Sequence, residues 1–448
     1  MVTIKPFMIL WFFICIWPMP SQDAKKSQEE LRRDTIRYGT DTEILALMTT
    51  LANEKLDYLD DDLADIAETT RNGKILVGAF NFFGERKKPG LEARAELALQ
   101  ERDNESNDTV EAAIAYMGKM GYSDGQDTIR EIIDSGEQRF APIAVRSLGL
   151  IGGGESADAN SEFLCALFDE GDTSDDTKRE ILISLGELKS TKAVAFLKAF
   201  AENADNRVVQ RMVALESIAK IRDETGLSAV LSSLSDADPN VRAVAVASLG
   251  PFSGTAVDAA ILEAFRDSFY KTRIAACKAA KERSLVAAIP YLRYRVERDE
   301  VPAVKDEALR ALAGIGNDES KAIIHGQFKD QRNADKVRIL AAELLIALDP
   351  NAYGVELIAE MDDAKTKKRT ALYNGFAKTI SQAATGSTLN LAQRFFTSGD
   401  IVEKNYALDM VRINKLKELE KEVRTLAEDK NESLARKAKE TLGALGLK

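Results

Sequence analysis

Apolar positions recur along this chain in a pattern that predicts pairs of helices. Residues 208–221 carry apolar side chains at helical spacing, a short turn follows, and residues 227–234 repeat the pattern on a second helix. Corresponding apolar positions in successive pairs lie 31 to 37 residues apart. A regular period over some 400 residues is typical of a repeat protein. The apolar column that marks the first helix of each pair consists of Leu51, Phe83, Met117, Leu148, Leu185, Ile218, Leu249, Ala280, Leu312, Leu345, Phe376, Val411 and Leu442.

Polar turns separate the predicted helices. The clearest is Asp-Ala-Asp-Pro-Asn at residues 236–240, where aspartate suits a helix N-cap and proline suits the first helical turn. The helix that follows, VRAVAVASLG at residues 241–250, ends in the Leu-Gly pair that also closes the helices near 148 and 185. A helix pair of this size cannot bury its apolar stripe alone, so each repeat must pack on its neighbours.

The two-helix unit with aspartate in the turn and the VRAVAVASLG helix resembles HEAT repeats, and most of all their short, phycobilin-lyase-type subtype. The resemblance covers roughly residues 40–447 and weakens at both ends. It implies an all-α fold, a right-handed α-solenoid of about 13 two-helix HEAT-like repeats. It also implies that first helices lie on the convex side and second helices line the concave side. We therefore expect a polar lead-in over residues 23–39 and a single solenoid over residues 40–448.

The first 22 residues have the features of a secretory signal peptide. Lys5 precedes an apolar run at residues 7–17, and Pro18 and Pro20 end that run before a polar exit. The run is too short to cross a bilayer, which takes about 20 residues. We therefore expect cleavage near residue 22 and export to the periplasm or cell envelope, with no membrane span in the mature chain.

A second column supports the repeat register. Basic residues lie seven positions before eight consecutive members of the apolar column, and an aspartate lies six positions before five of them (Asp172, Asp205, Asp236, Asp299 and Asp363). Two interpretations are open, an anion-binding stripe or a structural ladder that joins one repeat to the next, and we favour the ladder. The basic column consists of Lys178, Arg211, Arg242, Arg273, Lys305, Arg338, Arg369 and Lys404.

The most specific surface pattern lies on the second helix near residues 289–298. Ile289, Leu292 and Val296 form its apolar stripe, and tyrosines and arginines occupy the other positions. Tyrosine and arginine are enriched at the energetic centres of protein interfaces. If second helices line the concave side, this stripe faces the groove; an ordinary solvated face is the alternative. The candidate binding residues are Tyr291, Tyr294, Arg295 and Arg298.

Composition limits the chemistry. The net charge of −11 argues against a nucleic-acid partner, which requires a basic excess. The only histidine, His325, cannot build a histidine-rich metal site, and it leaves histidine-dependent catalysis a single possible base. Acidic residues at 57–68 form either a solvated face or a calcium site. We expect no catalytic residue, no metal and no cofactor.

These observations favour an exported, non-enzymatic scaffold that binds protein partners along a concave solenoid surface, in a bacterial cell-envelope assembly. The alternative is a chaperone-like or lyase-like HEAT protein that acts on a chromophore, a ligand or another protein. That alternative rests on the repeat subtype alone, and fold analogy is a weak basis for function. The sequence identifies neither the partner nor the oligomeric state.

Overall fold

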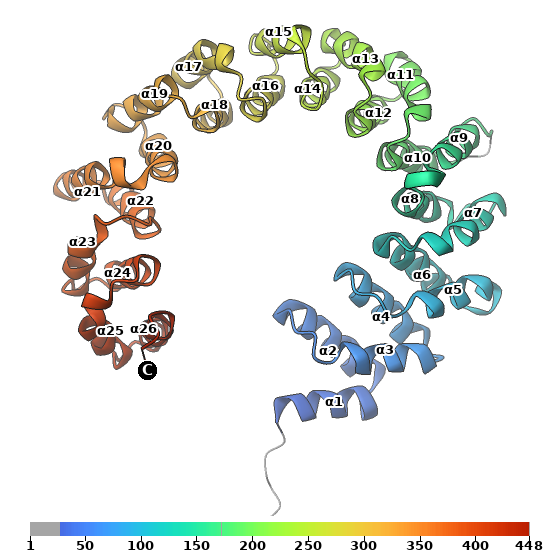
Figure 1. The fold of residues 1–448 in the computed structure, drawn as a ribbon, viewed down its shortest axis with the longest axis horizontal. Coiled ribbons are helices and arrows are strands. Elements are labelled where there is room, and N and C mark those ends of the chain that lie inside the picture. The colour runs from blue at the N-terminus through green and yellow to red at the C-terminus, as the bar shows by residue number, and fades with distance from the viewer. Residues whose placement is uncertain (1–26, 172, 448) are drawn as a thin grey trace, which may run out of the picture. The chain divides into compact units, whose positions relative to one another are not determined.

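The computed structural model describes residues 27–171 and 173–447 (Figure 1). Over these residues the chain forms α-helices and short 3-10 helices, and it contains no strand. The expected signal peptide at residues 1–22 lies outside the described residues. The chain divides into two compact units, the first ending at Ser147 and the second beginning at Leu148. The prediction of an all-α fold is confirmed.

The first unit begins with a helix inside the expected lead-in, and helix pairs follow. A 3-10 turn precedes some of the second helices. Its helices are α1 (Gln28–Tyr38), α2 (Asp41–Glu54), α3 (Asp60–Thr69), α4 (Gly73–Glu85), α5 (Glu92–Gln100), η1 (Arg102–Asn104), α6 (Asn107–Met120), η2 (Ser123–Gly125), α7 (Gln126–Asp134) and the start of α8 (Ala141–Ile151).

The second unit continues the alternation of first and second helices to the end of the described chain. Its helices are η3 (Gly154–Ser156), α9 (Ala157–Phe168), α10 (Asp175–Leu188), η4 (Thr191–Ala193), α11 (Val194–Glu202), α12 (Val208–Ile221), η5 (Glu224–Gly226), α13 (Leu227–Ser232), η6 (Ser233–Ser235), α14 (Pro239–Ala247), α15 (Thr255–Ala264), α16 (Tyr270–Glu282), η7 (Val286–Ala288), α17 (Ile289–Arg298), α18 (Pro302–Ile315), α19 (Asp318–Lys329), α20 (Asp335–Leu348), α21 (Pro350–Thr366), α22 (Thr370–Ser381), α23 (Thr388–Phe396), α24 (Ile401–Asn414), η8 (Lys417–Leu419), α25 (Glu420–Ala427) and α26 (Glu432–Ala444).

The apolar column lies on the even-numbered helices, one residue on each, with Leu249 two residues beyond the end of α14. Every member of the column is buried, from Leu51 at 0% exposed to Leu442 at 7%. Within each unit, these side chains form the core between successive helix pairs. The predicted repeat register is therefore confirmed, because the apolar positions predicted from the sequence are the buried positions of the fold.

Local chemistry explains where α14 begins and ends. The Asp238 carboxylate accepts a hydrogen bond from the Asn240 backbone N–H at 2.7 Å, and Pro239 occupies the first helical turn. The helix stops at Ala247, four residues before Pro251, which has no backbone N–H to continue it. As a result α14 has 9 residues, whereas α12 has 14.

Small residues let the even-numbered helices of the second unit approach one another closely. A methyl group added to Gly149 would lie 2.8 Å from the Ser184 Cα, and one added to Gly186 would lie 2.8 Å from the Ser217 Cα. The Ser217 hydroxyl donates to the Leu182 carbonyl of the preceding even helix at 2.7 Å. Close helix packing thus requires glycine in the Leu-Gly pairs at Gly149 and Gly186.

Larger side chains separate the odd-numbered helices. The rings of Phe168 on α9 and Phe200 on α11 meet edge to face at 5.2 Å between centroids, and Phe265 stacks on Tyr291 at 5.6 Å. Consecutive even helices accordingly share broad contacts, whereas consecutive odd helices touch only in places. The spacing between helices depends on the side chains at the contact, so the row with small residues is the tighter row.

The tighter row lies on the inside of the curve of the second unit. Figure 1 shows α12, α14, α16 and α18 on this inner row and α13, α15, α17 and α19 on the outer row. The expected orientation is therefore wrong for this unit: first helices line the concave side and second helices the convex side. The reason is the difference in side-chain volume between the two rows, which the resemblance did not reveal.

Candidate functional site

Arginines of the basic column bridge consecutive turns of the second unit. Arg273 forms a two-pronged ion pair with Asp299, with its Nε and Nη2 each 2.8 Å from a carboxylate oxygen. Arg242 pairs in the same way with Asp267 at 2.8 and 3.1 Å, and Arg211 pairs with Asp236. Each arginine thus contacts the aspartate of the next repeat, 25 or 26 residues ahead.

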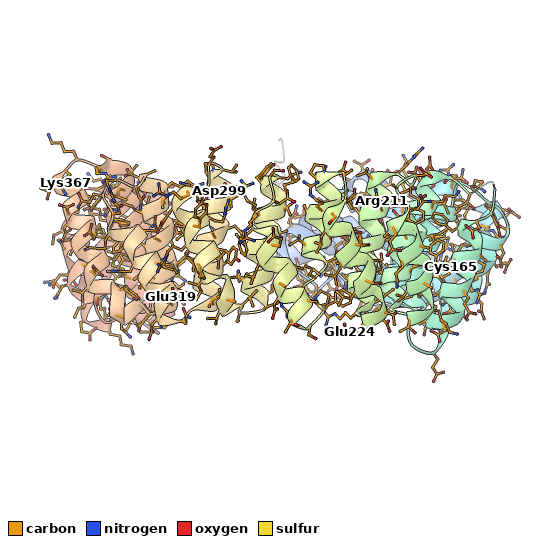
Figure 2. The ribbon with its side chains drawn as sticks, turned by 90° about the horizontal axis from the view of Figure 1, so that it is seen from above. Cys165, Arg211, Glu224, Asp299, Glu319 and Lys367 are labelled. Atoms are coloured by element: carbon orange, nitrogen blue, oxygen red, sulfur yellow. The ribbon has the colours of Figure 1, made fainter. Side chains whose placement is uncertain are left out.

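Two of these arginines also bind the turn that precedes their own helix. Arg242 Nη1 donates to the Asp236 carbonyl at 2.9 Å, and Arg273 Nη1 donates to the Asp267 carbonyl at 3.0 Å. These two guanidinium groups therefore join successive turns, whereas Arg211 Nε donates to the Ala201 carbonyl in the last turn of α11 at 3.0 Å. Figure 2 shows Arg211 and Asp299 along one edge of the second unit, with Glu224 and Glu319 along the opposite edge.

Burial and hydrogen bonding act in opposite directions on the aspartates of this series. Burial alone would raise the pKa of Asp299, whose side chain is 0% exposed. Hydrogen bonds from Arg273, the Val301 backbone N–H and Arg295 more than offset burial, so its pKa is lowered. The pKa of Asp267 is lowered for the same reasons, with Arg242 as its main side-chain donor. Both carboxylates are therefore ionised at neutral pH.

Other members of the basic column depart from this pattern. Arg338 pairs with Glu360 at 2.6 Å and donates to the Phe328 carbonyl at 2.8 Å, whereas Arg369 pairs backward with Asp335. The Lys178 ammonium lies 5.3 Å from the centre of the Phe168 ring. Neither Lys305 nor Lys404 forms an ion pair with a described residue. The continuous Arg–Asp series is limited to Arg211, Arg242 and Arg273.

Only two of the five aspartates predicted from the sequence belong to the Arg–Asp series. Asp236 and Asp299 belong to it, whereas Asp363 pairs locally with Lys367 and the Asp205 backbone N–H bonds to Asn203. Asp172 lies outside the described residues. Sequence reasoning missed Asp267, although it lies six positions before Arg273, as the column rule requires.

Three of the four candidate binding residues of α17, Tyr291, Tyr294 and Arg295, line a shallow hollow on the outer row, and Arg298 is not part of its lining. Its volume is about 300 Å³, and its lining is largely apolar. We call this feature the α17 hollow. The lining residues are Arg266, Pro290, Tyr291, Tyr294 and Arg295.

Two of the four candidates are structural as well as exposed to the hollow. The Tyr291 ring stacks on buried Phe265, with the Arg266 guanidinium 5.4 Å from its centre. Arg295 lies over the Tyr294 ring at 4.7 Å and pairs with buried Asp299 at 3.1 Å. Its Nε is buried and has no hydrogen-bond partner among the described residues. Arg295 therefore connects the hollow to the Arg–Asp series.

The other two candidates are free to contact a partner. Tyr294 is 55% exposed, and Arg298 is exposed and forms no ion pair with a described residue. Helix α17 carries three arginines against one glutamate, although the whole chain has a net charge of −11. These residues lie on the outer row in Figure 1, so the expectation that they face the concave groove is wrong.

A second hollow lies at the C-terminal ends of α10, α12, α14 and α16, where α14 stops early. Its volume is about 620 Å³. Glu187 and Lys220 line it and already pair with each other at 2.6 Å. Because its lining is of mixed charge, this hollow selects no particular class of partner.

Residues 27–171 and 173–447 contain no cluster of three or more His, Cys, Asp or Glu side chains arranged to hold a metal ion. Within the same residues, no helix has the length and apolar content needed to cross a bilayer. His325 bonds through Nε2 to Glu356 on α21 at 2.8 Å. Asp60, within the acidic segment, pairs with Arg86 at 2.6 Å.

Solved structures that match this chain share little sequence with it. A structure of Kap95p with RanGDP has a TM-score of 0.47 and 12% identity, and it matches over 94% of this chain and 67% of its own. A Kap121p mutant has a TM-score of 0.42 and 12% identity, over 94% of this chain and 50% of its own. Escherichia coli YibA has a TM-score of 0.40 and 15% identity, and it matches over 57% of this chain and 95% of its own. This chain thus spans half the length of Kap121p.

No curated protein is detectably similar in sequence to this chain. A family of repeat proteins, in contrast, matches almost the whole described chain, from residue 36 to residue 441. The match confirms the HEAT resemblance that the helix pattern and the turn aspartates indicated. The chain belongs to the family of spirochaete HEAT repeat proteins.

Proposed function

We propose that this chain is an exported, non-enzymatic scaffold that binds a protein partner through the α17 hollow, in a cell-envelope assembly. The observation that carries the proposal is exposed Tyr294 in a largely apolar hollow, with unpaired Arg298 one helical turn further along α17. Aromatic and arginine side chains that can be fully desolvated supply most of the energy at protein interfaces. The export part rests on the basic, apolar and polar segments of residues 1–22.

The binding part is tested by crosslinked capture from the native envelope fraction, with the chain from residue 23 onward as bait. One variant carries Tyr294→Ala and Arg298→Gln, both at exposed positions on the outer row. The matched control carries Tyr270→Ala and Arg310→Gln, at exposed positions of α16 and α18 on the inner row. We expect a partner that is retained by wild type and control and lost by the α17 variant. Loss by the control alone would contradict the proposed site.

The export part has a separate test. The full-length chain is expressed in its native host, and each cell fraction is examined with an antibody. The N-terminus of the recovered protein is then sequenced. We expect a protein in the envelope fraction that begins near residue 23. A cytoplasmic protein that still carries residues 1–22 would contradict export without bearing on the binding site.

A further inference from the structure

The charge around the α17 hollow differs from that of the rest of the chain. Arg266 and Arg295 line it, and Arg298 lies one helical turn after Tyr294 on α17, although the chain as a whole is acidic. Arg266 pairs with Glu263, but both side chains are highly exposed, and exposed pairs contribute little. Arg298 has no ion pair with a described residue. The rim of the hollow therefore offers cationic groups that an incoming carboxylate can pair with.

The partly exposed guanidinium of Arg295 points to the same class of partner. Its Nη1 is paired with Asp299, but its buried Nε has no acceptor among the described residues. Arg295 lines the hollow and its side chain is 19% exposed, so a carboxylate that enters the hollow can pair with its guanidinium.

The lining between these arginines is apolar. Pro290 and the rings of Tyr291 and Tyr294 make up most of it, and its volume of about 300 Å³ lies at the lower end of the range for small-molecule pockets. The stacking of Tyr291 on Phe265 holds one wall in place. This shape fits one apolar or aromatic side chain better than it fits an extended polyanion, which needs a longer basic track.

We propose that the α17 hollow binds an acidic segment of the partner protein. One apolar or aromatic side chain of the segment packs between Tyr291 and Tyr294, and neighbouring aspartates or glutamates pair with Arg266, Arg295 and Arg298. Electrostatic complementarity of this kind sets specificity and the association rate. The inference rests on the proposed function and adds the chemistry of the partner to it.

Short fluorescein-labelled peptides test this inference by anisotropy. One set has a central leucine, phenylalanine or tyrosine between glutamates; the matched set has glutamines in their place. We expect the glutamate set to bind, and added salt to weaken its binding. Tyr294→Ala and Arg298→Gln should each raise the dissociation constant at least about tenfold, the effect of an interface hot spot. Tyr270→Ala and Arg310→Gln should leave it unchanged.

Several results would overturn the inference. Equal binding of the glutamine peptides would exclude a role for the acidic residues, and sensitivity to the Tyr270 and Arg310 controls would move the site to the inner row. If the chain binds phosphatidylglycerol vesicles or duplex DNA more strongly than the peptides, and the α17 variants lose that binding, the ligand of the hollow is another polyanion and not an acidic protein segment. If no peptide binds although capture depends on Tyr294 and Arg298, the acidic-segment inference fails and the proposed function stands. If capture is also independent of these residues, both fail.

Discussion

Asp299 has a larger structural role than its single charge suggests. Its buried carboxylate accepts hydrogen bonds from Arg273 on α16, from Arg295 on α17 and from the Val301 backbone N–H that starts the next turn. Sequence spacing identified Asp299 and Arg273 as members of regular columns. The spacing could not identify them as partners of each other. Asp299 lies six residues before one basic residue of the column, but in the fold it pairs with Arg273 of the preceding repeat.

Asp299→Asn should lower the free energy of unfolding by about 3 kcal/mol, because it removes the buried charge that two arginines share. Urea denaturation followed by circular dichroism measures the loss. Asp318→Asn is the control, since the Asp318 side chain is fully exposed and its nearest cation is 3.9 Å away. The control should change the stability by about 0.5 kcal/mol or less. Equal effects of the two substitutions would show that the Arg–Asp series does not stabilise the fold.

The lowered pKa of Asp299 predicts that the stability of the fold depends on pH. The pKa of Asp299 is lower in the folded chain than its ordinary value, so its contribution is complete above about pH 4 and is lost as the pH falls through the folded-state pKa. The difference in urea midpoint between wild type and Asp299→Asn should therefore narrow at acidic pH. A difference that widens as the pH falls would mean that the pKa of Asp299 is raised by folding.

At the scale of the helix, the register of the repeats was predictable and the direction of curvature was not. The apolar column could be read from the sequence because burial of one stripe imposes a helical period on it. Curvature instead depends on which residues meet between repeats, as Gly186 meets Ser217 on the inner row and Phe168 meets Phe200 on the outer row. These contacts join residues about one repeat apart. The pattern of residues within a single helix therefore cannot predict them.

Gly186→Ala tests the close approach of the inner helices. Alanine favours a helix over glycine by about 1 kcal/mol, but here its methyl group would lie 2.8 Å from the Ser217 Cα. We expect a net loss of about 1–3 kcal/mol from overpacking. Gly326→Ala on outer helix α19 is the matched control, because no atom lies within 4 Å of its added methyl, and it should raise the urea midpoint. An increase for both variants would contradict tight inner packing.

At the scale of the whole molecule, stability in a repeat protein is local. Within each unit, helix pairs contact their neighbours in the sequence, so a defect in one pair should spread only to adjacent pairs. Part of this organisation could be predicted from the repeat period. The position of the α17 hollow could not, because it depends on the packing of Tyr291 against Phe265 in the neighbouring repeat.

Hydrogen exchange with mass spectrometry tests this locality. Asp299→Asn should speed amide exchange in α16, α17, α18 and α19, the helices on either side of the broken contact. Exchange in α24 and α26, several repeats away, should match that of wild type. Uniform acceleration along the second unit would show that it opens as one cooperative body.

The most direct test of the proposed function is a photo-crosslink from one defined face. A photoreactive phenylalanine analogue replaces Tyr294 on the outer row or Tyr270 on the inner row, which are 55% and 37% exposed. Each protein is irradiated with the native envelope fraction, and the crosslinked peptides are sequenced. We expect position 294 to crosslink a single partner through an acidic segment and position 270 to yield no such product. A specific partner crosslinked from position 270 and not from position 294 would contradict the account.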